Sequence, residues 1–296
     1  TAASNTININ NNNIAIGYPN VAAAGNTING IINSSSANTV NINSNTVSQI
    51  PAVNLAGTGT WIMIEGGSPG GTLNTNNNIV SNIVRTGASG TFRGVKAATP
   101  VGLWTCTGNL VENISYSTVA STGSIDGIFD ANSATLINIS SNIIRNLSTP
   151  TTGTINGIRI NTITGTHTCN NNQVYNFSTT AGGVGGATFA GISFSVGNLS
   201  ASGNTIYALN STGSTGGTGG VITGFFQGGG TTTTIFNNKI YNLSSSSTGV
   251  TVYGMNISGG TTNTIYNNII GDLRASAANL ANAIRGIDVA STNANI

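Results

Sequence analysis

The charged side chains of this chain gather in one stretch. The sequence holds eight Lys and Arg and six Asp and Glu in 296 residues. Eight of these fourteen lie between positions 85 and 159: Arg85, Arg93, Lys96, Glu112, Asp126, Asp130, Arg145 and Arg159. Asp126 and Asp130 are the only close pair of acids, and two carboxyl groups about 5 to 9.5 Å apart can cleave a glycosidic bond by acid–base catalysis. Cleavage of a polysaccharide is therefore the chemistry to weigh first.

The elements that must position these side chains follow from an asparagine that recurs every 30 to 34 residues. Self-similarity at such a period is typical of solenoids and propellers. The recurring residues, which we call the ladder asparagines, are Asn12, Asn45, Asn78, Asn109, Asn142, Asn172, Asn204, Asn238 and Asn268.

Apolar residues recur at fixed offsets from the ladder asparagines. The position two residues later is always Ile or Val, and the positions three before and five after are mostly apolar. A glycine recurs in eight coils, with Trp61 interpreted as filling its place in the remaining one: Gly30, Gly94, Gly127, Gly157, Gly191, Gly224, Gly254 and Gly286. The residue after this glycine gives a fourth apolar column. Each column predicts one inward-facing row of a stack.

The columns indicate strands rather than helices, because they are short, β-branched and lack the i, i+3, i+4, i+7 pattern. Inward positions three before and two after the asparagine cannot share one uninterrupted strand, since strand side chains alternate. We therefore expect a corner at the asparagine, which tolerates a left-handed conformation and can bond to its copies in neighbouring coils. Three short strands per turn describe an all-β parallel β-helix of about nine coils, spanning residues 1–296 as a single segment.

With its asparagine ladder, the chain resembles the right-handed parallel β-helix of the pectin-lyase-like superfold. The segments Thr262–Leu273 and Ala283–Val289 resemble the Asn/Gly/Thr-rich repeats of giant bacterial surface proteins of the type IX secretion kind. This resemblance implies a secreted, structural or adhesive rod at the cell surface, cut from a longer protein whose further coils are its first partners. Lateral or homo-oligomeric association of rods and contact with cell-surface glycans stay open.

The repeat frame places the charged residues around the glycine column. Arg93 is expected beside Asp126, with Lys96, Phe129 and Arg159 at outward positions of successive coils. In lyases and hydrolases of the resembled superfold this face holds the catalytic carboxylates and arginine. Asp130, however, falls in an inward column, and the three-Asp, His-Gly and Arg-x-Lys motifs of those hydrolases cannot be read here. We therefore expect surface ion pairs, Arg93 with Asp126 and Glu112 with Arg145, and no enzyme. We assign no catalytic residue and keep the polysaccharide-cleaving enzyme as an alternative.

Aromatic residues form a second outward column, three residues after the ladder asparagine. It contains Tyr175, Tyr207 and Tyr241 in consecutive coils, with Phe236 and Tyr266 close by. Such a row stabilises a sheet by stacking. Contact with sugar rings or with a neighbouring protomer is the alternative interpretation.

The remaining reactive residues predict no metal or cofactor site. Cys106 and Cys169 share an inward column two coils apart, about 9.6 Å, which is too far for a disulfide. His167 falls in an apolar column and has no second histidine with which to bind a metal. Four Asn-x-Ser triplets begin four residues after a ladder asparagine, and we interpret them as structural turns: Asn113, Asn146, Asn176 and Asn242.

Composition limits the partners further. Only 5% of the residues are charged, with a net charge of +2, which argues against nucleic acid, whose binding relies on clustered Lys and Arg. The sequence contains no run of about 18 apolar residues and therefore predicts no membrane-inserted segment. Length varies mainly between asparagine and glycine, in loops such as 179–187, 211–220 and 244–249, which could bind a partner or be tolerated slack. Ice binding ranks last, on the expectation that no outward column is dominated by threonine.

Overall fold

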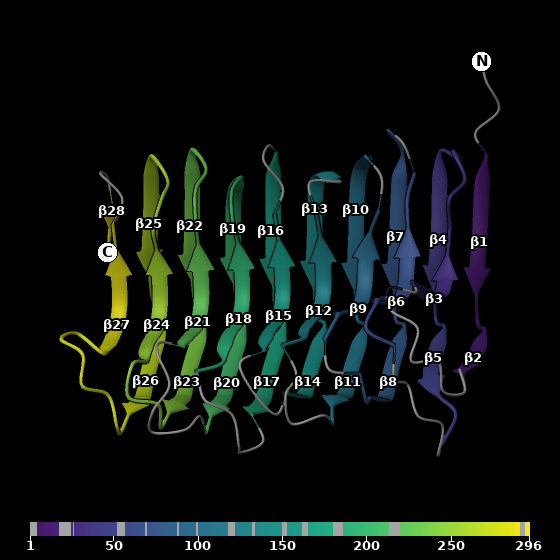
Figure 1. The fold of residues 1–296 in the computed structure, drawn as a ribbon. Coiled ribbons are helices and arrows are strands. Elements are labelled where there is room, and N and C mark those ends of the chain that lie inside the picture. The colour runs from purple at the N-terminus through teal and green to yellow at the C-terminus, as the bar shows by residue number, and fades with distance from the viewer. Residues whose placement is uncertain are drawn as a thin grey trace.

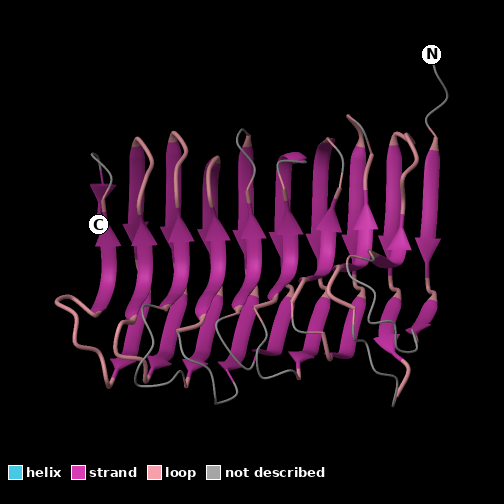
Figure 2. Cartoon of the chain, viewed as in Figure 1, coloured by secondary structure: helices cyan, strands magenta, loops and turns pink. Residues whose placement is uncertain are grey.

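The protein is a parallel β-solenoid in a computed structural model (Figures 1 and 2). The structure describes residues 5–17, 25, 27–51, 57–68, 70–87, 89–98, 100–117, 122–131, 134–149, 153–161, 165–179, 186–212, 220–290 and 294–296. All regular elements in these residues are strands, so no described helix is long and apolar enough to cross a membrane. Figure 1 shows the coils side by side, from the N-terminal coil in purple to the C-terminal coil in yellow.

Three parallel sheets form the walls, and each coil contributes one strand to each sheet. The first, sheet A, has ten strands: β1 (Thr6–Asn10), β4 (Thr39–Asn43), β7 (Thr72–Asn76), β10 (Val101–Thr107), β13 (Ala134–Ser140), β16 (Thr166–Asn170), β19 (Asn198–Ser202), β22 (Thr232–Phe236), β25 (Thr262–Tyr266) and β28 (Ala294–Asn295).

Sheet B follows the asparagine corner and has nine strands: β2 (Asn13–Ile16), β5 (Thr46–Gln49), β8 (Ile79–Arg85), β11 (Leu110–Tyr116), β14 (Ile143–Thr149), β17 (Gln173–Thr179), β20 (Thr205–Ser211), β23 (Lys239–Ser245) and β26 (Ile269–Ala275). Sheet C also has nine: β3 (Ile28–Ile32), β6 (Thr60–Gly66), β9 (Thr91–Ala97), β12 (Ser124–Asp130), β15 (Thr154–Ile160), β18 (Thr188–Phe194), β21 (Val221–Gln227), β24 (Thr251–Ile257) and β27 (Ile284–Val289).

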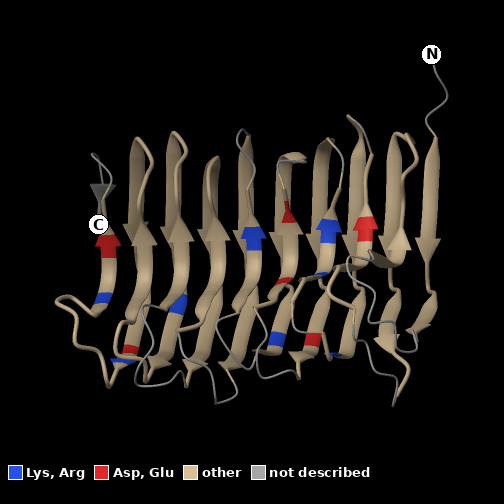
Figure 3. Ribbon diagram, viewed as in Figure 1, with Lys and Arg blue, Asp and Glu red and all other residues tan. Residues whose placement is uncertain are grey.

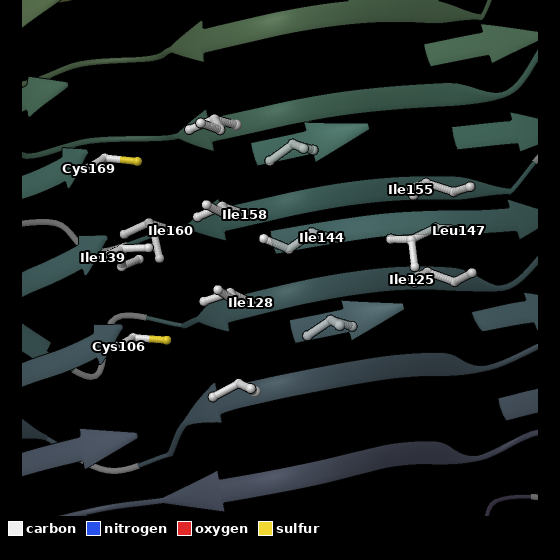
Figure 4. Close-up of a cluster of buried hydrophobic side chains, with 14 of the residues drawn as sticks. Cys106, Ile125, Ile128, Ile139, Ile144, Leu147, Ile155, Ile158, Ile160 and Cys169 are labelled. Carbon is white, nitrogen blue, oxygen red and sulfur yellow. The ribbon is translucent and has the colours of Figure 1, made fainter. Parts of the chain in front are cut away.

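The predicted inward columns form one continuous core. Ile42, Cys106 and Ile139 stand in one row of sheet A, and all three are completely buried. Figure 4 shows Cys106 and Cys169 on either side of Ile139, with the isoleucines of the neighbouring strands pointing into the same space. The prediction of a β-helix with stacked apolar columns is confirmed.

The glycine column has a steric cause. A Cβ added to Gly157 would lie 2.4 Å from Val174 Cγ1 and 2.5 Å from the Gly191 carbonyl oxygen. Gly191 and Gly224 meet the β-branched residues Ile206 and Ile240 of sheet B in the same way, at 2.5 Å. Glycine in sheet C therefore makes room for the Ile and Val column that follows each ladder asparagine, because real Cβ atoms cannot approach so closely.

One assignment within this column was wrong. Trp61 pairs with Phe92 and Ile28, so it belongs to an inward column and does not replace the glycine. Met63 stands at that position, since the flanking pairs Ile62 with Arg93 and Ile64 with Val95 enclose it. Consequently Ile64, rather than Ile62, belongs to the column after the glycine.

The ladder asparagines are bonded to each other along the whole solenoid, which confirms the predicted ladder. The side-chain carbonyl of each accepts the backbone N–H and the amide N–H of the ladder asparagine in the preceding coil, at 2.9 to 3.0 Å. From Asn45 onward, the side-chain amide of each ladder asparagine also donates to a backbone carbonyl of the preceding coil; Asn45, for example, donates to the carbonyl oxygen of Ile9. Nine asparagines thus enclose eight complete turns.

The left-handed residue at the corner is the neighbour of the ladder asparagine, which corrects the expectation from the sequence. The residue immediately before it has φ between +53° and +68° in every coil: Asn11, Ser44, Asn77, Gly108, Ser141, Asn171, Gly203, Asn237 and Asn267. Asn, Ser and Gly tolerate this region better than bulky residues. The ladder asparagine is thereby left free to use its side chain for bonding.

A second left-handed position lies four residues after the ladder asparagine. Asn113, Asn146 and Asn176 have φ of +56° to +58° there, and their exposed amides form a second chain of hydrogen bonds that begins at Asn82. The Asn-x-Ser triplets therefore coincide with turns, as the sequence analysis interpreted them.

The expectation that no outward column is dominated by threonine was wrong. One outward row of sheet A holds six threonines in nine coils: Thr6, Thr39, Thr72, Thr166, Thr232 and Thr262. An outward row of sheet C holds five in seven coils: Thr60, Thr91, Thr154, Thr188 and Thr251. Both rows keep a fixed offset in the sequence, six residues before the ladder asparagine in sheet A and three before the glycine position in sheet C.

Candidate functional site

Arg93, Asp126 and Arg159 meet on the outer side of sheet C, in three consecutive coils. Arg93 and Asp126 are cross-strand partners, as are Phe129 and Arg159. Arg159 forms a two-point contact with Asp126, with Nε to Oδ1 at 2.8 Å and Nη2 to Oδ2 at 2.6 Å. Arg93 approaches the same carboxylate at 3.7 Å. The cluster predicted from the repeat is therefore assembled around Asp126.

Phe129 lies between the two arginines of this cluster. The guanidinium carbons of Arg93 and Arg159 are 4.0 and 4.4 Å from its ring centroid. A cation over an aromatic face is stabilised by the ring quadrupole. The ring and the carboxylate therefore hold the same two cations from different sides, and burial lowers the pKa of Arg93 while Asp126 opposes that shift.

The cluster is packed rather than open. Asp126 has no exposed surface and Phe129 is 3% exposed. Asn156 donates to Asp126 Oδ1 at 2.8 Å, and Lys96 pairs with Glu65 at 2.5 Å beside it. Together with the two bonds from Arg159, the bond from Asn156 gives the carboxylate of Asp126 three N–H donors.

Asp130 does not join Asp126. It is completely buried and stands between Ala97 and Ile160 in an inward column. Asp126 instead contacts groups on the outer face of the sheet. The two acids therefore face opposite sides of sheet C, which is not the arrangement in which two carboxylates flank a sugar.

A mixed row runs along the outer side of sheet B. In consecutive coils the cross-strand partners are Glu112, Arg145, Tyr175, Tyr207 and Tyr241. Arg145 bonds to Glu112 at 2.6 Å and donates to the Tyr175 hydroxyl at 2.9 Å. These two hydrogen bonds, the one to Tyr175 first, raise the pKa of Arg145. The predicted pairing of Glu112 with Arg145 is confirmed, and it is continuous with the tyrosines.

The tyrosines stack with nearly parallel rings. Tyr175 and Tyr207 have centroids 4.6 Å apart at an interplanar angle of 8°, and Tyr207 and Tyr241 follow at 5.1 Å and 4°. Tyr207 has a raised pKa because of partial burial and its two phenolic neighbours. Each inner ring therefore has both faces occupied.

The row ends at Gly271. This glycine is the cross-strand partner of Tyr241 in the next coil, and a Cβ placed on it would have no atom within 4 Å. Tyr241 is 39% exposed. The face of its ring toward Gly271 therefore has no aromatic partner.

Another stack lies across the asparagine corner on sheet A. Phe236 and Tyr266 are 5.1 Å apart at 4°, and Tyr266 is 44% exposed. No strand of sheet A contains Lys, Arg, Asp or Glu, as the absence of red and blue on these strands in Figure 3 illustrates. The aromatic stacks therefore border an uncharged surface.

Arg85 was recognised in the sequence only as one of the charged residues, but it is completely buried. It donates to the Tyr116 hydroxyl at 2.6 Å and to the Gly57 and Gly59 carbonyls at 2.8 and 3.0 Å, and it lies 4.7 Å from the Trp61 ring centroid. Burial lowers its pKa and raises that of Tyr116 to about 12. The signal was its position two residues after inward Ile83, where strand alternation points a side chain inward.

His167 and the two cysteines are core residues. His167 stands between Ile137 and Leu199 in sheet A, has no exposed surface, and stacks on Phe194 with centroids 6.2 Å apart. Burial lowers its pKa to about 4. Cys106 and Cys169 are free thiols, and burial raises the pKa of Cys106 to about 12.

In the part of the chain that the structure describes, no three His, Cys, Asp or Glu side chains gather closely enough to hold a metal ion.

We found no matching protein-family model, no similar curated protein and no similar solved structure.

Proposed function

We propose that the chain is part of an extracellular structural rod that attaches to surfaces through its uncharged and aromatic faces. The observation that carries this proposal is the unbroken asparagine ladder, because it ties every coil to the next and makes a repetitive wall without disulfides. Adhesion is supported by the stacked tyrosines, since exposed aromatic groups are common at binding surfaces. The likeness to repeats of large bacterial surface proteins supports the location.

Attachment is tested with the whole chain coupled to beads. We expect beads that carry it to be retained under flow on surfaces coated with bacterial or host glycans, whereas beads coated with serum albumin wash off. Equal loss of both kinds of beads from every glycan surface would refute the adhesive role. Location is tested by protease treatment of intact cells of the source organism, which should remove the protein if it is exposed at the surface.

Ice binding is a second candidate, favoured by the threonine rows. Threonines repeat along sheet A at the coil spacing of about 4.8 Å, on a face without charged residues. Regular hydroxyl and methyl groups of this kind can order water at a crystal surface. Measurement of thermal hysteresis decides: activity that disappears in Thr232→Lys would support ice binding, and no activity in the unaltered chain would exclude it.

A polysaccharide-cleaving enzyme has less support. Asp126 is already bonded to Arg159 and Asn156, and Asp130 faces the core. Incubation with neutral and acidic polysaccharides, with reducing ends and unsaturated products measured, tests it directly.

A further inference from the structure

We infer that Tyr241 and Gly271 form a binding site for one pyranose ring of a glycan, in which the sugar takes the place of a missing rung of the tyrosine row. This inference rests on the proposed adhesive function and names the site and ligand class for it. The tyrosine row is the only part of the described outer surface where three aromatic rings stack in consecutive coils.

The spacing of the row sets the size of the site. The two occupied intervals have centroid distances of 4.6 and 5.1 Å, which is about one coil spacing. A planar or chair-shaped ring that stacks on the free face of Tyr241 at a similar distance would therefore lie directly over Gly271. No atom within 4 Å of a Cβ at that glycine opposes it.

Glycine at this position is not explained by the backbone or by the core. Gly271 is absent from the residues with positive φ, and its cross-strand partner Tyr241 places it in an outward row rather than in the inward glycine column. A larger residue would fit without strain. The missing side chain therefore leaves an open slot next to the unstacked face of Tyr241.

The rim of the slot combines one apolar and several polar groups. Ile269, two residues before Gly271, is 61% exposed, and Lys239 stands beside it in the preceding coil. On the other side lie the exposed pair of Arg274 and Asp272, 2.6 Å apart, and Asn242 at a left-handed turn. An aromatic face bordered by hydrogen-bonding groups suits a sugar, whose ring carries C–H bonds on its faces and hydroxyls on its edge.

The chemistry separates a sugar from other flat ligands. A purely aromatic ligand would use only the Tyr241 face and Ile269, and would leave the charged and amide groups of the rim without a role. A pyranoside uses both. The ion pair of Arg274 and Asp272 offers a donor and an acceptor to adjacent hydroxyls, as charge-assisted hydrogen bonds do in polar sites.

The test is a titration of the whole chain with methyl pyranosides, followed by the ring resonances of Tyr241 in NMR spectra. Neutral, N-acetylated and uronic methyl glycosides are used as probes, with p-cresol as the aromatic comparison. We expect saturable shifts with at least one pyranoside, and at least tenfold weaker binding in both Tyr241→Ala and Gly271→Tyr. In Gly271→Tyr the chain's own side chain fills the slot.

A matched control places a new tyrosine elsewhere in the same column. Ser48 aligns with Ser81 in that column, far from Gly271, so Ser48→Tyr should leave pyranoside binding unchanged. The melting temperature of each variant shows whether it is folded. If a folded Gly271→Tyr bound as the unaltered chain does, or if only p-cresol shifted Tyr241, the inference would be overturned.

The outcomes separate this site from the proposed function. Adhesion of beads that is unchanged in Gly271→Tyr would overturn the slot but leave the adhesive rod. Pyranoside binding that the variant abolishes, without any adhesion of beads, would keep the slot and overturn the adhesive role. Absence of both would overturn both.

Discussion

The outer faces of sheets B and C show two ways of using the same scaffold. On sheet C, Arg93, Asp126 and Arg159 close on themselves around Phe129, and the carboxylate at the centre has no exposed surface. On sheet B, a row of five residues in consecutive coils begins with an ion pair and ends at an unstacked ring, Tyr241. A cluster whose charged groups are already paired with one another leaves few contacts for a ligand. A periodic aromatic row that stops leaves the free face of its last ring for a ligand to stack on.

This contrast also explains why charge was a poor guide to the candidate site. Charged groups are expensive to bury unless they are paired, so a dense cluster in a packed surface is expected to be self-compensated. An aromatic row carries no such requirement. Its last member can stay exposed at low cost, as Tyr241 does.

The largest expected effect comes from opening the closed cluster. Asp126→Ala should lower the free energy of unfolding by about 3 kcal/mol, because it leaves Arg159 and Arg93 without their buried counter-charge and Asn156 without an acceptor. Urea unfolding followed by circular dichroism measures the change. Asp126→Asn keeps one acceptor oxygen and should cost less; equal stability of Asp126→Ala and the unaltered chain would show that the cluster is not closed in solution.

A change in the core, away from both faces, gives the next effect. The pKa of His167 is lowered from 6.5 to about 4 in the folded chain, so the unfolded chain binds a proton that the folded chain does not. Stability should therefore be lost as pH falls from about 6.5 towards 4, at about 1.4 kcal/mol per pH unit from this residue.

The matched variant is His167→Leu, which repeats the residue of the aligned Leu199. The unfolding free energy of His167→Leu minus that of the unaltered chain should be about 2 kcal/mol larger at pH 5 than at pH 8. The same difference between the two chains at both pH values would contradict the buried neutral imidazole. Because neither outer face is altered, this change in unfolding free energy reports on the core alone.

A smaller effect is expected from breaking the open row. Tyr207→Ala removes two stacking contacts from half-buried rings and should cost about 1 to 2 kcal/mol. Tyr207→Phe keeps the rings and should cost less than half as much. If the alanine variant destabilised the chain as strongly as Asp126→Ala does, the distinction between a closed and an open face would be wrong.

The smallest effect should come from extending that row. Gly271→Tyr supplies a further ring at the expected spacing and should stabilise the chain by about 0.5 to 1 kcal/mol, through stacking and through a lower entropy of the unfolded chain. Thermal melting compares it with Gly271→Ala, which tests the backbone contribution alone. A loss of stability in Gly271→Tyr but not in Gly271→Ala would mean that the slot is narrower than one ring.

The sequence predicts those parts of the fold that repeat. The asparagine ladder, the apolar columns and the outward tyrosines could be found because each recurs at a fixed offset from one residue. In the first coil the left-handed residue could not be identified, because Asn11 and Asn12 are equally suited by type; Gly108 and Gly203, each directly before a ladder asparagine, are the sequence signal that was missed. Met63 was missed because Trp61 and Met63 lie 31 and 33 residues from Gly30 and Gly94 in opposite order, so the spacing from these glycines does not separate the two.

Features of the site that depend on single coils could not be read from the period. The burial of Asp126 depends on the two-point contact of Arg159 and the bond from Asn156, a side-chain geometry that no spacing encodes. The threonine rows, in contrast, keep fixed offsets from the ladder asparagines and from the glycine column, so they could have been read from the sequence. The open slot at Gly271 is a departure from a repeat, and it is recognisable only after the register of sheet B is known.

The asparagine ladder also gives the rod a direction. In all eight links the side-chain carbonyl accepts from the preceding coil, so every amide dipole along the corner points the same way. Dipoles of about 3.5 D each add along the axis, as they do in a helix. The corner is therefore an electrically polar line inside an almost uncharged protein. Within it, each ladder asparagine accepts hydrogen bonds from the coil before it and donates hydrogen bonds to the ladder asparagine of the coil after it.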